Sequence, residues 1–180
     1  MTDSNYLRGE LRPVVEELDL PERDKLYLHS RWLDQLVWMD GRATRNRTLY
    51  FAARTTVVIG GILVPAFVSL LGFCDSRSQL LSFHNFTIGL SLLVALSASV
   101  EGLFHWGEKW QHYRGNVEVL RSEGWEFAQL SGDYSRFANV KDALPLFVEH
   151  VEGVIRSDVS SYFEKISLRD RFDDSNPLQP

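Results

Sequence analysis

The chain has 180 residues, with 19 Lys and Arg against 24 Asp and Glu, and its net charge is −5. It lacks the basic excess typical of nucleic-acid binders, so we expect no nucleic-acid partner. A hydrophobic content of 44% excludes disordered and collagen-like chains, and a single cysteine, Cys74, excludes an internal disulfide framework. Charged residues make up 24%, which is typical of a soluble domain, but they are absent from two long stretches.

Residues 1–21 are predicted to form a flexible N-terminus. Its first residues, Met1–Tyr6, are polar and acidic and carry no signal-peptide pattern. Pro21 then opens a predicted cytoplasmic helix over residues 22–50, which leads directly into the first apolar stretch. One side of this helix is expected to pack against another helix. The residues on that side are Leu26, Leu33, Leu36 and Val37, with Trp32 beside them.

A first transmembrane helix is predicted over residues 51–74. Its segment Thr55–Cys74 contains no charge, and as a helix of 20 residues it rises about 30 Å, the thickness of the hydrocarbon core. Pro65 lacks the backbone N–H that would bond the carbonyl of Gly61, so a kink is expected near the middle of the span. The sequence leaves open whether this kink is a static bend or a gating hinge.

A short external loop over residues 75–82 is predicted to lead into a second transmembrane helix over residues 83–104. The loop holds one basic residue, Arg77, whereas the approach to the first span holds four. Because positive charge gathers on the cytoplasmic side of a membrane, both termini are expected in the cytoplasm, with membrane lipid as a partner. The four arginines of the approach are Arg42, Arg45, Arg47 and Arg54.

Small and weakly polar residues form a stripe on one side of the second span, and leucines cover the other side. One interpretation is close packing of helices, with Ser and Thr hydroxyls bonded to the preceding turn. The other is that the stripe lines a water-filled path once several copies assemble; both hold if one flank packs and the other is wetted. The pore-lining candidates are Thr87, Ser91, Ala95, Ala98 and Gly102.

The second helix is predicted to continue into the cytoplasm as a coiled-coil-like extension over residues 105–130. Apolar and small residues recur there at spacings of three and four, which is the pattern of a heptad seam. The helix that precedes the first span is its expected packing partner. The seam consists of Trp106, Trp110, Tyr113, Val117, Leu120, Gly124 and Phe127.

An acid–histidine ladder occupies the boundary between the second span and this extension, with members at i, i+4, i+7 and i+11. Structural ion pairing is one interpretation. The other is the inner mouth of a pore, where carboxylates attract cations and histidines make conduction sensitive to pH. A metal site would need ligands from neighbouring helices, and the usual Glu-x-x-His pairing is missing, so no metal is expected. The ladder consists of Glu101, His105, Glu108 and His112.

A C-terminal amphipathic helix is predicted over residues 141–167, with Asp142 as its N-cap, followed by a flexible tail over residues 168–180. The chain contains no Walker motif, no dinucleotide-binding glycine motif and no Gly-x-Ser-x-Gly turn, so we expect neither an enzyme nor a cofactor. The residues at helical spacing in the C-terminal helix are Leu144, Val148, Val151, Ile155 and Tyr162.

Several sequence blocks point to a known family, namely Arg31–Arg47, Gly60–Pro65, Trp110–Arg114 and Glu123–Glu126. They resemble a bacterial family of two-span membrane proteins of unknown function that is allied to the SLATT superfamily. The resemblance covers residues 22–165 and implies a location in the bacterial inner membrane. Members of that superfamily are proposed to form pores as effectors in conflict systems, often beside or fused to nucleotide-sensing domains. This chain has no room for a sensor, so a trigger is expected from a cytoplasmic protein or a small ligand.

These patterns together predict an all-α fold, in which a two-helix transmembrane hairpin extends into a cytoplasmic helical bundle. A lone hairpin encloses no lumen, so conduction requires a homo-oligomer. The predicted function is a homo-oligomeric pore or ion channel lined by the second span. The alternative is a non-conducting membrane anchor or scaffold that recruits a cytoplasmic partner through its C-terminal helices.

Overall fold

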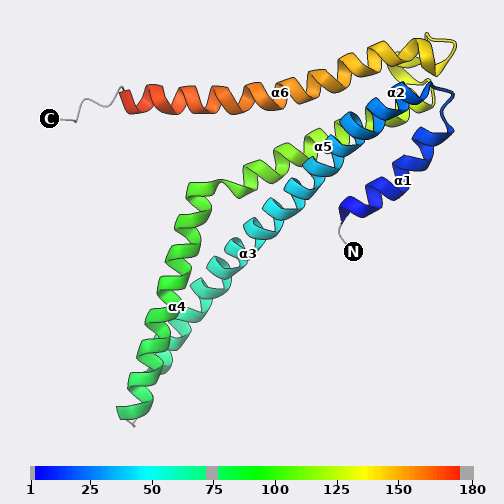
Figure 1. Cartoon of the computed structure of the whole chain (residues 1–180). Helices are drawn as coiled ribbons and strands as arrows, with labels where there is room; N and C mark the ends of the chain where they lie inside the picture. Colours follow the sequence, from blue (N-terminus) through cyan, green and yellow to red (C-terminus); the bar gives the residue numbers. More distant parts are fainter. Residues whose placement is uncertain (1–2, 72–76, 175–180) are drawn as a thin grey trace. The chain divides into compact units, whose positions relative to one another are not determined.

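The computed structural model describes residues 3–71 and 77–174, with side chains over residues 6–70, 81 and 83–160. Across these residues the elements are all helical and there is no strand, which confirms the all-α prediction (Figure 1). In chain order the elements are α1 (Asp3–Glu17), α2 (Glu22–Tyr27), the π-helix η1 (Leu28–Leu33), α3 (Asp34–Leu71), α4 (Arg77–Phe104), α5 (Trp106–Ala128), the 3-10 helix η2 (Gly132–Tyr134) and α6 (Val140–Asp174).

Two compact units make up the chain, and each is described by itself. Unit 1 comprises residues 1–40 and 115–180, and unit 2 comprises residues 41–114. Helices α3 and α5 each contribute to both units, because they run across the boundary. Both apolar stretches of the sequence fall within unit 2.

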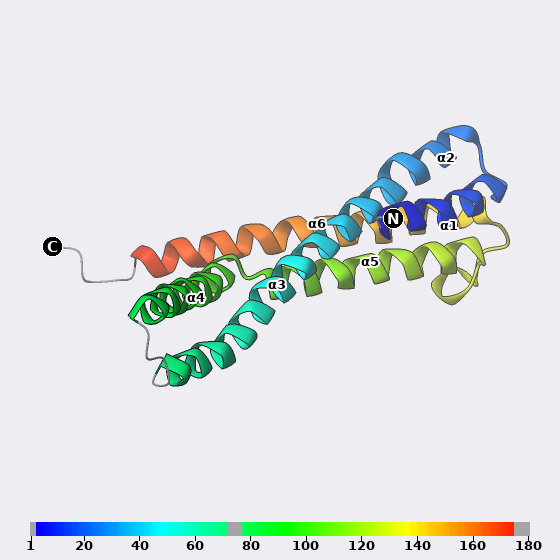
Figure 2. The same ribbon diagram turned by 90° about the horizontal axis from the view of Figure 1, so that it is seen from below.

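Unit 1 is built around four buried aromatic residues. Phe127 of α5 stacks on Phe147 of α6, with ring centroids 4.4 Å apart. Trp32 of η1 meets Phe147 edge-on at 5.6 Å, and Tyr134 of η2 meets Phe127 at 5.8 Å. Aromatic side chains bury large areas and gain further from such edge and stacked contacts, so this cluster joins α5 to α6, which lie side by side here (Figure 2).

Trp32 reaches this cluster by lying against a glycine. A Cβ added at Gly124 of α5 would collide with the indole ring, so only glycine permits the approach. The indole Nε1 of Trp32 donates a hydrogen bond to the carbonyl oxygen of Leu120 at 3.0 Å, which satisfies its one polar group. The predicted seam of α5 is thus buried over its last four positions, namely Val117, Leu120, Gly124 and Phe127.

The N-terminus differs from the prediction of a flexible segment over residues 1–21. Residues 3–17 form helix α1, and Leu7, Leu11 and Val15 are buried at a spacing of four. The Arg121 guanidinium of α5 also donates to the Glu10 carboxylate of α1 at 2.8 Å. An apolar stripe and an ion pair therefore attach a segment that its polar composition suggested would be free.

The predicted helix over residues 22–50 is present, but it passes through a π-helical segment, η1. Leu28, Trp32 and Leu33 of η1 are buried. Leu26, which the sequence places on the packing side, is 64% exposed instead. A π-helix has more residues in each turn than an α-helix, so a face extrapolated at 3.6 residues per turn loses its phase there.

Helix α6 begins and ends elsewhere than predicted. Asn139 is its N-cap, since the Asn139 side-chain oxygen accepts the backbone N–H of Asp142 at 2.9 Å, and the predicted cap Asp142 is wrong. The helix also continues to Asp174, into the predicted flexible tail. The side chain of Tyr162 lies outside the described residues. The buried face is Ala143, Phe147, Val151 and Ile155, so the predicted positions Leu144 and Val148 are one residue out of phase.

Two helical segments, Glu22–Leu70 and Phe83–Phe104, are long and apolar enough to cross a membrane by length and composition. The later part of the first segment and all of the second belong to unit 2. Only 6% of each apolar window is buried in the protein, whereas the core helix of a soluble domain would be mostly buried. Helix α4 already begins at Arg77, so the predicted loop over residues 75–82 is wrong for its later part. Cys74 and residues 75–76 lie outside the described residues.

We expect Gly124→Ala to lower the free energy of unfolding of the protein by about 1–3 kcal/mol, because the new Cβ displaces the Trp32 ring from a filled core. This loss should exceed the gain of about 1 kcal/mol that alanine brings to a helix interior. Chemical unfolding of the purified protein, followed by circular dichroism, measures the difference.

Gly115→Ala is the matched control in the same helix. A Cβ added at Gly115 meets nothing within 4 Å, so this substitution should stabilise the protein by about 0.5–1 kcal/mol. If both substitutions stabilised equally, the close contact between Trp32 and Gly124 would be contradicted.

Candidate functional site

Helix α4 packs on α3 with one face. Gly60 of α3 lies directly against Val94 of α4, and the rings of Phe67 and Phe86 meet edge-on with centroids 5.2 Å apart. Thr87 is only 7% exposed. The buried and half-buried positions of α4 recur at spacings of three and four, which defines a seam between the two helices. The buried and half-buried positions of this α4 seam are Thr87, Leu90, Val94, Ser97 and Glu101.

The small-residue stripe lies mostly beside this seam and not within it. Thr87 belongs to both sets, but Ser91, Ala95, Ala98 and Gly102 are exposed. A Cβ added at Gly102 would meet nothing within 4 Å. Contact with α3 therefore accounts for one member of the stripe and leaves the other four uncovered in the single chain.

The hydroxyl groups of the stripe bond to their own helix. Thr87 Oγ1 donates to the carbonyl oxygen of Phe83, and Ser91 Oγ donates to that of Thr87, each at 2.8 Å. The donors are thus satisfied without another chain, while the hydroxyl oxygens keep lone pairs that can accept hydrogen bonds. The stripe is a weakly polar, uncharged surface that suits close packing as well as contact with water.

The predicted kink residues of α3 are exposed, unlike the neighbouring Gly60. Gly61 and Pro65 are exposed, and a Cβ at Gly61 would meet nothing within 4 Å, whereas Gly60 makes the close contact. Helix α3 continues through Pro65 to Leu71. Ser69 Oγ donates to the Pro65 carbonyl oxygen at 2.9 Å. A hinge at Pro65 stays a prediction.

The sequence predicts that the acid–histidine ladder runs along one continuous helix, but in the structure it does not. His105 has a φ of 51°, a left-handed conformation that is uncommon for residues other than glycine, and it separates α4 from α5. Its backbone N–H still bonds the Glu101 carbonyl oxygen at 2.9 Å. Glu101 is half-buried, while His105, Glu108 and His112 are exposed. The break therefore places Glu101 in α4 and Glu108 and His112 in α5.

No group of three or more His, Cys, Asp or Glu side chains that could hold a metal ion occurs within the part of the chain that the structure describes. The sequence places the four ladder residues at spacings that suit one face of a straight helix. Because the left-handed residue interrupts that face, the ladder offers no set of converging ligands of the kind that a metal requires.

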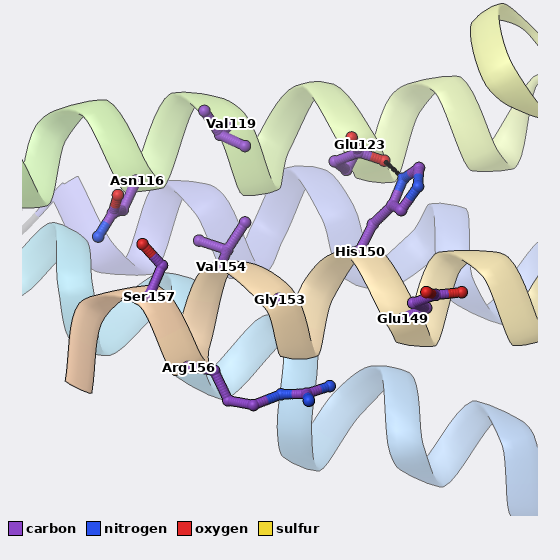
Figure 3. A pocket seen from close by; sticks show the side chains of 9 residues that line it. All are labelled: Asn116, Val119, Glu123, Glu149, His150, Gly153, Val154, Arg156 and Ser157. Carbon is purple, nitrogen blue, oxygen red and sulfur yellow. Dashed lines mark hydrogen bonds and ion pairs between the residues drawn. The ribbon is translucent and has the colours of Figure 1, made fainter. Parts of the chain in front are cut away.

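A second candidate site, which the sequence did not reveal, is an open groove of about 730 Å³ between α5 and α6 in unit 1 (Figure 3). Val119 and Val154 face each other across it, and Arg156 points away from α5. The groove is lined by Asn116, Val119, Glu123, Glu149, His150, Gly153, Val154, Arg156 and Ser157.

A three-residue network lies at one end of this groove. The Tyr134 hydroxyl donates to Glu123 Oε2 at 2.6 Å, and His150 Nδ1 lies 3.1 Å from the same oxygen. Burial, then the hydrogen bond and charge of Glu123, raise the pKa of Tyr134, so the phenol keeps its proton. We therefore assign a proton to His150 Nδ1, which leaves Nε2 as the ring atom that can bind a polar ligand.

A further ion pair attaches α6 to the first helices of unit 1. Arg31 Nε and Nη2 donate to the two carboxylate oxygens of Glu152 at 2.7 and 2.9 Å. The hydrogen bond from Arg31 lowers the pKa of Glu152, and burial beside Glu152 raises the pKa of Tyr27 to about 12. The ion pair of Glu152 therefore stabilises the fold fully at pH values above the ordinary pKa of a glutamate. This stabilisation is lost as the pH falls through the lowered pKa of Glu152.

The groove and its network were missed because their members come from distant parts of the sequence. Glu123 and His150 are 27 residues apart on different helices, and Tyr134 lies in the turn between them. No short motif joins such residues. The available signal was the spacing of Ala143 and Phe147, which fixes the side of α6 that meets α5 and hence the position of His150 next to it.

His105→Gly should raise the free energy of unfolding by about 1 kcal/mol, because glycine adopts the left-handed conformation without the steric cost that a Cβ brings. His105→Val should lower it by at least as much, since a β-branched residue is worst suited to this conformation. Thermal unfolding of the two variants under the same conditions compares them. Equal stability of the glycine and valine variants would contradict the helix break.

A family model described as "Protein of unknown function (DUF4231)" matches residues 34–142 of the chain. The match spans α3, α4, α5 and η2 and includes every residue of the stripe and the ladder, together with Glu123 and Tyr134 of the groove. Neither the curated proteins nor the solved structures contain a match to this chain. Since the matched range covers more than half of the 180 residues, the chain belongs to the DUF4231 family of proteins of unknown function.

Proposed function

We propose that the chain is an integral membrane protein in which α3 and α4 form a transmembrane hairpin, and that several copies assemble into a pore lined by α4. Both apolar segments have the length and composition of a span, and their side chains are largely uncovered in the single chain. Apolar surface of this extent needs lipid or protein around it. Insertion in a bilayer supplies the lipid.

The proposed orientation has both termini in the cytoplasm. Four arginines precede the apolar part of α3, and Arg77 is the one basic residue near the start of α4. The resemblance to a family allied to the SLATT superfamily supports a bacterial inner membrane as the location. It also supports a pore, whose trigger would be a cytoplasmic protein or a small ligand.

The observation that carries the pore is the uncovered stripe. Helix α4 has a face for α3 and a leucine-rich face suited to lipid, and the stripe of Ser91, Ala95, Ala98 and Gly102 lies between them. In a homo-oligomer these four residues form the wall of a path along the axis, whereas Thr87, the fifth candidate, lies against α3. Glu101 and His105 then lie at its inner mouth, with Glu108 and His112 beyond it, where carboxylates attract cations.

Ion flux through vesicles that contain the purified protein tests the proposal. Ser91→Leu should reduce the flux about tenfold or more, because the larger apolar side chain narrows and dries the path. Gly89→Leu is the matched control: Gly89 is exposed on the leucine-rich side of α4, and a Cβ there meets nothing within 4 Å. Flux should survive this control. Absence of flux from the unmodified protein across a range of pH, voltage and candidate ligands would overturn the pore.

The second candidate is a non-conducting anchor that recruits a cytoplasmic partner, and the groove between α5 and α6 favours it. The groove combines two apolar side chains, Val119 and Val154, with the polar atoms of Glu123 and His150. Sites that bind ligands or partners commonly join these two features.

The oligomeric mass in detergent separates the two candidates. Light scattering of the purified protein should give a mass of several copies for the pore, because two helices per copy cannot enclose a path alone. A monomer or dimer, together with unchanged behaviour of Ser91→Leu, would support the anchor and contradict the pore.

A further inference from the structure

The charge of the chain is divided unevenly between its two units. Unit 2, residues 41–114, contains seven Lys and Arg and three Asp and Glu, a net charge of +4. The whole chain carries −5, so the remainder carries −9. The segment from residue 41 to 54 holds four of the basic residues and no acidic one. A concentrated positive segment in an acidic protein calls for an anionic partner.

Three of these arginines are exposed and have no carboxylate partner. Arg45, Arg47 and Arg54 form no ion pair or hydrogen bond with any residue that the structure describes. The guanidinium of Arg47 lies 5.9 Å from the centre of the Phe51 ring. We call these three residues the arginine cluster.

Three arginines of unit 1 each have a carboxylate partner. Arg8 pairs with Asp34 at 2.9 Å, Arg31 with Glu152 at 2.7 Å and Arg121 with Glu10 at 2.8 Å. The protein therefore supplies carboxylates to these arginines in unit 1 and none to the arginine cluster.

The depth of the cluster is marked by aromatic side chains. Tyr50 of α3 lies against Gly107 of α5, where a Cβ would meet the tyrosine ring at 2.8 Å. Phe104 and Trp106 stack with ring centroids 5.6 Å apart on either side of the helix break. Aromatic residues gather at the headgroup level of membranes, so the cluster lies at or next to the lipid headgroups in the proposed orientation.

We propose that the arginine cluster binds the phosphate groups of anionic phospholipids in the cytoplasmic leaflet. This proposal rests on the membrane insertion proposed above. A guanidinium presents two parallel N–H groups to the oxygens of a phosphate, a geometry that a lysine ammonium does not offer. The exposed guanidinium groups are free to do so because no carboxylate of the described chain competes for them. The arginine cluster directly precedes the apolar segment of α3, which holds it beside lipid in the proposed orientation. We therefore favour a lipid over nucleic acid or a soluble anion.

The test uses the full chain reconstituted in vesicles of equal parts phosphatidylcholine and phosphatidylglycerol. After mild solubilisation, mass spectrometry counts the lipids of each kind that stay bound. The unmodified protein should retain phosphatidylglycerol in preference to phosphatidylcholine. The triple variant Arg45→Gln, Arg47→Gln and Arg54→Gln should lower this preference by about fivefold or more, since each basic side chain near an anionic surface strengthens binding by about that factor.

A second triple variant, Arg12→Gln, Arg23→Gln and Arg136→Gln, is the matched control. It removes the same charge from exposed arginines of unit 1 and should leave the preference unchanged. An equal loss of preference in both variants, or no preference in the unmodified protein, would overturn the lipid site.

Flotation of the vesicles distinguishes this failure from failure of the proposed function. A protein that floats with the vesicles but retains both lipids equally overturns the lipid site alone. A protein that does not float overturns the membrane insertion and the lipid site together.

Discussion

The contact between Trp32 and Gly124 is the constraint on which the rest of unit 1 depends. The absence of a side chain at one position of α5 lets the indole ring reach the backbone and donate to the Leu120 carbonyl oxygen. From that position the ring meets Phe147, which stacks on Phe127. One glycine thus fixes the separation of η1 and α5 and provides the surface on which α6 packs, so a change there affects three elements at once.

Much of the fold follows from periodicity in the sequence. The lengths of the apolar stretches, the helix that precedes the first of them and the buried part of the α5 seam all depend on spacing and composition alone. Helix α1 carried the same kind of signal in Leu7, Leu11 and Val15, but polar residues between them concealed it. The predicted N-cap of α6 was wrong by three residues, because Asn139 and Asp142 both have side chains that can cap a helix. Only the geometry shows that Asn139 accepts the backbone N–H.

Other features could not be predicted, because they arise from irregular backbone or from tertiary contact. The π-helical segment η1 shifts which residues of the helix face the core, and its sequence contains no glycine or proline that would predict this shift. The break falls on His105, although the glycines Gly102 and Gly107 beside it are the residues that sequence rules favour for such a position. The groove of α5 and α6 required knowledge of which helix faces meet, and this depends on the aromatic cluster.

Glu101 imposes a stronger demand on the surroundings of α4 than the serines and threonine do. The hydroxyls of Thr87 and Ser91 bond to carbonyls of their own helix, so they are satisfied in lipid, in protein or in water. A carboxylate cannot donate a hydrogen bond to a carbonyl of its own helix. In the proposed span, Glu101 is half-buried near the end of an apolar helix. Burying its charge without a donor costs far more than burying a bonded hydroxyl. Any assembly of α4 must therefore bring water or a hydrogen-bond donor to this level, and this requirement limits the permitted arrangements more than the stripe does.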